Sequence, residues 1–186
     1  MRVSREQAAE NRERIIATAA RLFREKGFDG IGVADLMQAA GLTHGGFYGH
    51  FASKEDLVAQ ACARTFARSI AAWGRSAGQG RRGALAAIAG SYLSVEHRDH
   101  PGHGCLLAAL GTDVARQSPS VRRVVTEGLL GLVGLLTRVV PGRSATAKRK
   151  RALAMMASLV GALVLARAVD DDTLSEEILR ATAASL

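Results

Sequence analysis

The chain has 186 residues, which suits one domain or a small domain joined to a modest second one, and a core of that size needs no disulfide or metal. Hydrophobic residues make up 48% of the chain and aromatic residues only 4%, a balance that favours helices packed on helices over sheets. The formal net charge of +8 suggests a polyanionic partner, but residues 1–56 hold eight basic and eight acidic residues, so bulk charge does not locate a nucleic-acid site.

The sequence carries no sign of secretion or of a membrane span. Two cysteines, Cys62 and Cys105, lie in different segments, too few and too scattered for a disulfide framework. The N-terminus lacks the apolar core of a secretory signal, and the longest apolar run, Ala152 to Ala166, falls short of the ~20 residues that span a bilayer. We therefore expect a soluble, cytoplasmic protein with no membrane partner.

The N-terminal stretch predicts three helices. The first helix opens at a capping-box pattern at Ser4 and ends at Gly27. A short second helix starts near Val33. The third spans residues 44–50, with Thr43 as its N-cap. A tight turn between the second and third helices makes a helix-turn-helix unit, in which the third helix would enter the major groove.

The rest of the chain also predicts helices, so we expect an all-α protein. A longer fourth helix opens at Ser53 and fades into a Gly/Ser/Arg stretch at residues 74–83, which we expect to be a loop. The stretch "HRDHPGHG" should break the helix before it. Later helices are predicted near residues 85–93, 105–116, 119–140 and 146–169, and a last short one starts near Ser175.

The two long helices near residues 119–140 and 146–169 are apolar over more than one face, which a single neighbour cannot cover. Gly128, Gly131 and Gly134 thin one side of the first, at roughly 1 kcal/mol each in helix propensity, which only close helix approach would offset. We interpret both helices as a homodimer interface in a four-helix bundle. The alternative is that they form the core of a monomer.

The third predicted helix contains two adjacent glycines, Gly45 and Gly46, in a stretch whose flanks favour a helix. Small residues let a recognition helix run close to DNA, and we expect His44 to reach a base edge while polar neighbours bond to the DNA backbone. Few side chains remain for direct readout, which predicts modest base specificity. The residues assigned to DNA binding are Thr43, His44, Gly45, Gly46, Tyr48, His50 and Lys54.

Residues 14–57 combine an Ile-x3-Ala-x2-Leu-Phe helix, a Gly-Phe stop and the run Ala-Gly-Leu-Thr-x-Gly-x-Phe-Tyr-x-His-Phe-x-Ser-Lys-Glu-x-Leu. This arrangement resembles the N-terminal domain of the TetR family of bacterial transcriptional regulators. The resemblance implies an all-helical homodimer that binds a pseudo-palindromic operator, usually as a repressor, and releases it when a small ligand enters the C-terminal domain. It also matches Tyr48, His50 and Lys54 to phosphate-contacting positions and His44 to a base-contacting one.

The resemblance divides the chain into a helix-turn-helix DNA-binding domain, residues 1–53, and a helical ligand-binding and dimerisation domain, residues 54–186. Outside the first domain it rests on length, helical pattern and a "GCLLAALG" segment similar to one in part of the family. Gly32 departs from the pattern, because many relatives have Ser or Thr there. That glycine should loosen the cap of the second helix and one phosphate contact.

The stretch "HRDHPGHGC" places His97, His100, His103 and Cys105 within nine residues and allows three interpretations. In the first, the helix dipole and nearby Arg98 or protonated histidines lower the thiol pKa, which suits a sensor of oxidants or electrophiles. In the second, the three histidines and the cysteine bind a transition metal, although their spacing matches no strong zinc pattern. In the third, the cysteine is a small buried hydrophobe and the histidines are solvated.

An effector pocket is expected between the fourth helix and those that follow it. Each of its candidate residues could also be ordinary core, and Cys105 is the candidate sensor beside them. We assign no metal site and expect no cofactor. The pocket candidates are Phe66, Trp73, Tyr92, Leu110, Met155 and Met156.

Motifs of enzymes are missing from the sequence, which has no Gly-rich phosphate loop, Ser nucleophile elbow or credible carboxylate pair, so we expect no enzyme. We predict a one-component DNA-binding regulator, a homodimeric repressor on a palindromic operator, released by a small effector or electrophile or by modification of Cys105. The alternative is a ligand-independent architectural protein on double-stranded DNA, which the long C-terminal part disfavours.

Overall fold

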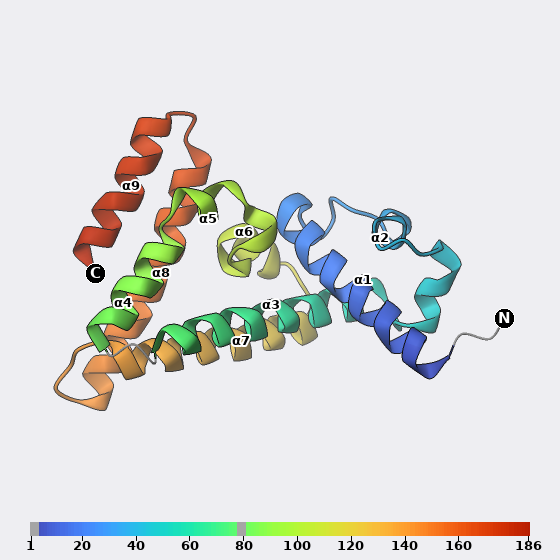
Figure 1. Ribbon diagram of the computed structural model, residues 1–186, viewed down its shortest axis with the longest axis horizontal. Helices are drawn as coiled ribbons and strands as arrows, with labels where there is room; N and C mark the ends of the chain where they lie inside the picture. The colour runs from blue at the N-terminus through green and yellow to red at the C-terminus, as the bar shows by residue number, and fades with distance from the viewer. Residues whose placement is uncertain (1–3, 78–80) are drawn as a thin grey trace.

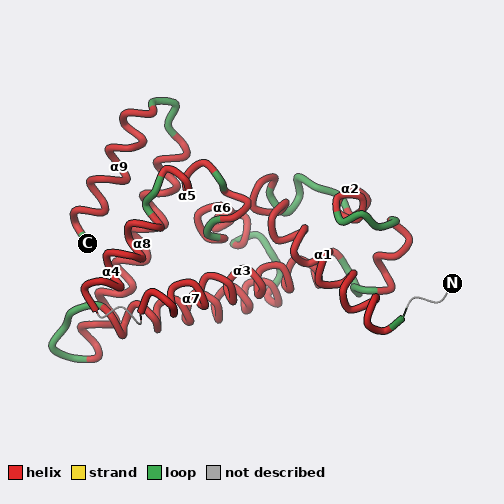
Figure 2. Tube along the Cα trace, in the orientation of Figure 1, coloured by secondary structure: helices red, strands yellow, loops and turns green. Residues whose placement is uncertain are grey.

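The computed structural model describes residues 4–77 and 81–186, and these residues form helices and connecting turns without strands (Figures 1 and 2). The all-α prediction is therefore confirmed. In chain order the elements are α1 (Arg5–Lys26), α2 (Val33–Ala39), the 3₁₀ helix η1 (His44–Gly49), α3 (Lys54–Ala77), α4 (Arg81–Tyr92), α5 (Val95–Asp99), the 3₁₀ turn η2 (Pro101–His103), α6 (Leu106–Val114), α7 (Pro119–Val139), α8 (Ala145–Ala168) and α9 (Asp172–Ser185).

The N-terminal elements α1, α2 and η1 gather at one end of the molecule (Figure 1). The predicted signals work as expected at both ends of α1: the Ser4 side chain accepts a hydrogen bond from the backbone N–H of Gln7 at 3.1 Å, and Gly27 ends the helix with φ +82°. Phe47 and Phe51 are buried with the apolar residues of α1 and α2. Burial of these two rings fixes η1 against the rest of the unit.

The predicted third helix is present, but as a 3₁₀ helix rather than an α-helix. The Thr43 hydroxyl does not cap it, and the backbone carbonyl of Thr43 accepts from the N–H of Gly46 at 3.1 Å instead. Two of its first three residues, Gly45 and Gly46, have poor helix propensity. Such a composition weakens the preference for an α-helix over a short 3₁₀ helix.

Helices α3 and α7 run side by side through the middle of the molecule (Figure 1). A Cβ at Gly128 would lie 2.1 Å from the Phe66 ring, and one at Gly131 would lie 2.6 Å from Cδ1 of Ile70. The glycines therefore do permit close helix approach, as predicted for them. Their partner is α3 of the same chain, so the interpretation of these two glycines as part of a dimer interface is wrong.

Several boundaries differ from the sequence prediction. Helices α3 and α4 extend into the expected loop at 74–83, of which residues 78–80 lie outside the described residues. The stretch expected to break the preceding helix follows the end of α4 at Tyr92 and itself contributes to α5 and η2. The last helix begins at Asp172, where the Asp171 side chain accepts from the N–H of Leu174 at 3.0 Å, and it has 14 residues rather than being short.

Helix α8 is the one helix in the described ranges that is long and apolar enough to cross a membrane on length and composition alone. The apolar run Ala152 to Ala166 is thus part of a longer helix of 24 residues. Within the most apolar window of α8, 39% of the residues are buried inside the protein. Leu153, Val164 and Leu165 are exposed large apolar residues of this helix.

Candidate DNA interface and effector cavity

The helix η1 presents polar side chains to solvent while Phe47 holds it to the core. Thr43, His44 and Gly45 are exposed, and Tyr48 is 71% exposed. No hydrogen bond to another described residue occupies the hydroxyls of Thr43 and Tyr48. These groups are therefore available to a partner outside the chain.

The fold itself does not require the two glycines of η1. A Cβ at Gly45 would meet no atom within 4 Å, and a Cβ at Gly46 would meet Cε of Met37 at an ordinary 3.7 Å. Neither residue has a positive φ angle, which in the described chain is confined to Gly27 and Gly41. The packing of the described chain therefore does not account for the two glycines.

His50 and Lys54, the remaining residues assigned to DNA, are partly buried at the end of η1 and the start of α3. The Ser53 side chain accepts from the N–H of Asp56 at 3.1 Å and starts α3 as predicted. Lys54 is thereby placed in the first turn of a long helix that crosses the molecule. A contact at Lys54 would act directly on that helix.

A cavity of about 320 Å³ lies between α3, α4, α5, η2 and the start of α6. Three of the predicted sensor and pocket residues, Trp73, Tyr92 and Cys105, line it. Its remaining lining includes small and polar residues rather than a wholly apolar wall. Among these are Ser69, Ser76, Ser91, Ser94, Glu96, His97, His100 and His103.

Four of the predicted pocket residues do not line this cavity. Phe66 is 4% exposed and lies against Gly128, so its ring fills the space between α3 and α7. Leu110, Met155 and Met156 are buried in the hydrophobic core of α6 and α8. Helical periodicity marked all four as buried, but periodicity does not tell a core residue from one that borders a cavity.

His97 joins the cavity wall to the start of α6. Its Nδ1–H donates to the carbonyl of Tyr92 at 2.7 Å, and its Nε2 accepts from the N–H of Cys105 at 2.9 Å, which fixes a neutral imidazole. Burial lowers the pKa of His97, against the opposing effect of the Tyr92 carbonyl. A Cβ at Gly104 would lie 2.5 Å from Nε2, so the glycine permits this bond.

The structure separates the three interpretations of the histidine and cysteine stretch. His97 is a bonded, half-buried residue and not a solvated one, although His103 is exposed. Across the described ranges, no group of three or more His, Cys, Asp or Glu side chains comes together to hold a metal. Cys105 is 8% exposed, sits at the N-cap of α6 and lines the cavity.

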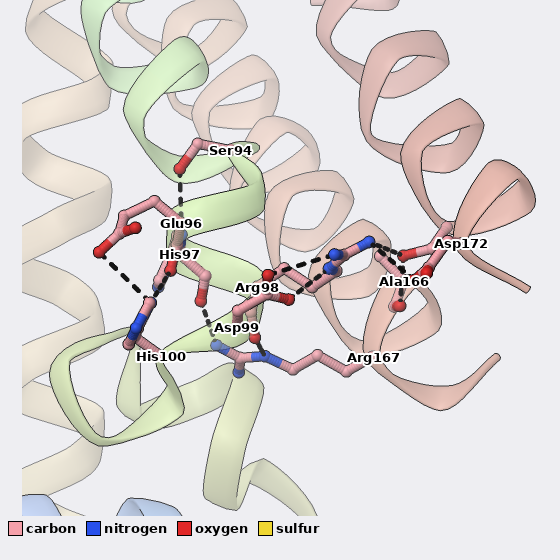
Figure 3. A network of polar contacts seen from close by, with 10 residues as sticks. Ser94, Glu96, His97, Arg98, Asp99, His100, Ala166, Arg167 and Asp172 are labelled. Atoms are coloured by element: carbon pink, nitrogen blue, oxygen red, sulfur yellow. Dashed lines mark hydrogen bonds and ion pairs between the residues drawn. The ribbon is translucent and has the colours of Figure 1, made fainter. Parts of the chain in front are cut away.

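Helix α5 is tied to the last two helices by a network of polar contacts (Figure 3). The Arg167 guanidinium on α8 donates to the carbonyl of Arg98 at 2.9 Å and to that of His97 at 2.6 Å. Arg98 in turn donates to Oγ of Ser175 on α9 at 3.0 Å. Displacement of α5 would therefore act on α8 and α9.

The turn η2, which follows α5, is held to the DNA-binding end instead. The side chain of Arg24 on α1 donates to the carbonyls of Pro101 (3.3 Å) and Gly102 and to Oγ1 of Thr65 on α3 (2.6 Å). A Cβ at Gly102 would lie 2.1 Å from Oε1 of Glu25, so α1 and η2 are packed closely. One short segment thus contacts the cavity, the last helices and α1.

Residues 15–61 match the family model for bacterial regulatory proteins of the tetR family. The N-terminal part of the chain therefore carries the DNA-binding domain of the TetR family. This part is the helix-turn-helix domain of that family, as the sequence predicted, and the chain is a DNA-binding transcriptional regulator.

Among similar TetR-family proteins, the repressor NemR of Escherichia coli K12 is 26% identical over 134 residues, 70% of this chain and 67% of NemR. The uncharacterised regulator YerO of Bacillus subtilis is 45% identical over 53 residues, which span 28% of this chain but only 18% of YerO. These relatives are transcriptional regulators rather than enzymes.

Two solved structures share the whole TetR fold with this chain. The reduced form of E. coli NemR has a TM-score of 0.81 at 23% identity and covers 95% of both chains. A TetR-family regulator from Agrobacterium tumefaciens has a TM-score of 0.80 at 22% identity, with 96% of this chain and 98% of that chain covered. At these identities the likeness concerns the fold alone.

Sequence reasoning missed two residues of this chain. Arg24 follows Ile16 and Ala20 at four-residue steps on the buried face of α1, so helical spacing could have marked it as a buried charge. Exposed Arg14 lies beside the turn after α2, with Nη1 4.0 Å from a Cβ position at Gly41. No local pattern in the sequence brings Arg14 to that turn.

Proposed function

We propose that the protein is a cytoplasmic, one-component repressor that binds a palindromic operator as a homodimer and releases it when its cavity is filled or Cys105 is modified. Residues 1–53 form the DNA-binding domain and residues 54–186 the ligand-binding and dimerisation domain. The observation that carries this proposal is a cavity of about 320 Å³ whose wall continues, through one short segment, into the contacts of α1. An architectural protein has no use for such a cavity.

A second copy of the chain is the partner we propose for the uncovered face of α8. At 100° per residue, the exposed uncharged residues of α8 from residue 152 onward fall within about 140° of one face. Leu153 is 45% exposed, Val164 42% and Leu165 57%. The face consists of Leu153, Ala154, Ala157, Ser158, Gly161, Val164, Leu165 and Ala168.

The proposed interface uses a different pair of helices from the pair near residues 119–140 and 146–169 that was predicted from the sequence. Helix α7 buries its apolar face on α3, α4 and α8 of its own chain and leaves Leu130, at 48% exposure, as its one exposed large apolar residue among those described. Helix α9 also packs on α8 and carries exposed Leu174. We therefore place the bundle at α8 and α9, with α7 inside the protomer.

Two leucine substitutions test this interface by sedimentation equilibrium. Leu165→Glu on α8 should convert the dimer to monomer, because a carboxylate would be buried in an apolar interface. Leu130→Glu on α7 places the same charge at a similarly exposed leucine and should leave the dimer intact. If Leu130→Glu dissociates the dimer and Leu165→Glu does not, the interface lies on α7.

The two cysteines differ in their access to reagents. Burial raises the pKa of Cys62 to about 12, so that thiol stays protonated and unreactive. Cys105 lines the cavity, where a molecule small enough to enter reaches its sulfur. Modification of Cys105 would add bulk beside its own backbone N–H, which donates a hydrogen bond to His97. Displacement of α5 and η2 would then act on Arg24 and so on α1.

The test of the proposed function is the fluorescence anisotropy of a labelled operator, selected from a random pool of double-stranded DNA. Reduced protein is titrated first, and the titration is repeated after iodoacetamide or hydrogen peroxide. We expect binding by the reduced protein and release after treatment. Release should persist in Cys62→Ala and be lost in Cys105→Ser.

The outcomes separate the possible functions. Release that does not depend on Cys105 would make the cavity a site for a non-covalent ligand only. Binding without sequence preference, and without release, would indicate the architectural alternative and refute the proposal. Selection of operators whose half-sites are not about one helical turn apart, or a multiple of it, would reject the dimer geometry.

A further inference from the structure

We propose that the chain binds a small inorganic anion in a second, smaller cavity at the junction of α1, α3 and η2. The cavity has a volume of about 30 Å³ and lies apart from the main part of the effector cavity. It has room for a chloride ion or for one oxyanion group of a phosphate that enters from solvent. Its lining residues are Ala17, Ala20, Arg24, Arg64, Thr65, Arg68, Ser69, His103 and Gly104.

The charges around this cavity have one sign. Three arginines, Arg24, Arg64 and Arg68, line it, with His103 beside them. None of the lining residues is an Asp or Glu. A concave site with several guanidinium groups and no carboxylate attracts an anion.

Arg24 is the central residue of the site because it is charged, buried and unpaired. It is only 7% exposed, yet its hydrogen bonds within the described chain go to neutral acceptors, the carbonyls of Pro101 and Gly102 and the hydroxyl of Thr65. No Asp or Glu of the described ranges forms a salt bridge with it. Buried charges in proteins are ordinarily paired, so a counterion is missing.

The two neighbouring arginines leave this charge uncompensated. Arg64 forms an ion pair with Glu13, whereas Arg68 makes no hydrogen bond or ion pair with any residue of the described ranges. Burial, together with repulsion from Arg68, lowers the pKa of Arg24 to about 10. An anion between Arg24 and Arg68 would relieve both effects and would join α1 to α3.

The position of the cavity gives such an anion a structural role. Ser69, His103 and Gly104 line both this cavity and the effector cavity, so they form the wall between the two. An anion held here would stiffen the contact between the DNA-binding domain and η2. The site itself does not depend on DNA, and its test therefore stands independently of the proposed function.

The test is isothermal titration of inorganic phosphate into the protein in sodium gluconate without DNA, because gluconate is too large for the cavity. We expect saturable binding of one phosphate per chain, with chloride as competitor. Binding should also raise the midpoint of thermal unfolding by about 3 to 6 °C when the anion is at about ten times its Kd.

Arg68→Gln is the decisive variant, because Arg68 is exposed and supports no other contact in the described chain. It should abolish the saturable heat and the thermal shift. Arg75→Gln removes another exposed arginine of α3, outside the cavity, and should retain both. Saturation by chloride alone would assign the site to the monatomic ion. Absence of saturable binding for both anions, or equal binding by wild type and Arg68→Gln, would overturn the inference.

Discussion

Replacement of Gly128 by alanine should destabilise the protein, although alanine is the better helix former. The helix propensity of alanine would contribute about 1 kcal/mol in favour of the variant. Against this, the new Cβ would lie 2.1 Å from Cγ of Phe66 and within 2.6 Å of two further ring atoms. Ordinary contact begins near 3.4 Å, so the buried ring must retreat by about 1 Å or more.

The balance is a net loss. Overpacking of a well-packed core costs about 1 to 3 kcal/mol, and a clash with a rigid aromatic ring belongs at the upper end of that range. After the gain in propensity, we expect Gly128→Ala to lower the free energy of unfolding by about 2 kcal/mol. For a chain of this size that loss corresponds to a fall of about 4 to 8 °C in Tm.

Gly134 is a matched control on the same helix, because a Cβ there would meet no atom within 4 Å. Gly134→Ala should gain about 1 kcal/mol and raise Tm by about 2 to 4 °C. Both variants are compared with wild type by circular dichroism at one protein concentration, since the proposed dimerisation would make Tm depend on concentration. A Gly128→Ala variant as stable as wild type would refute the close packing of α3 on α7.

Three further predictions concern DNA binding and pH. Lys54→Ala should weaken binding to all DNA sequences and reduce the salt slope of log K by about one, whereas His44→Ala should relax sequence preference, both measured by anisotropy at several salt concentrations. Gly45→Ala should leave Tm unchanged or higher but weaken operator binding by about tenfold, and unweakened binding would remove the case for close approach to DNA. The native pKa of His97 lies below its ordinary 6.5, so the native state binds this proton less readily than the unfolded chain does. The free energy of unfolding should therefore fall as the pH drops below 6.5. His97→Gln should reduce that fall, as measured by urea unfolding at pH 5.5 and 7.5.

The sequence could predict the DNA-binding unit because its signals are local. Ser4, Gly27 and Ser53 each act on residues within one helical turn, and Phe47 falls on a face that periodicity identifies. The type of helix at η1 was less accessible. The energies of α and 3₁₀ hydrogen bonding are close in a segment with two glycines, and tertiary packing decides between them.

The effector cavity could be predicted only in part, because its walls come from segments far apart in the sequence. Trp73, Tyr92 and Cys105 meet there through the packing of α3, α4 and α6, whereas Phe66 has the same periodicity and is core. Periodicity reports which face of a helix is buried and not what that face is buried against. The role of His97 depends on two hydrogen bonds to backbone groups, for which residue type carries no signal.

The glycines of the chain obey different physical requirements, and the difference bears on function. Gly27 needs its positive φ, and Gly128 needs the absence of a Cβ because Phe66 occupies that space. Gly45 meets neither requirement, yet it costs helix propensity in the segment that we predict to contact DNA. Nothing inside the described chain offsets that cost. A Cβ-free surface at η1 suits a closely approaching DNA backbone, which is the contact that we propose for it.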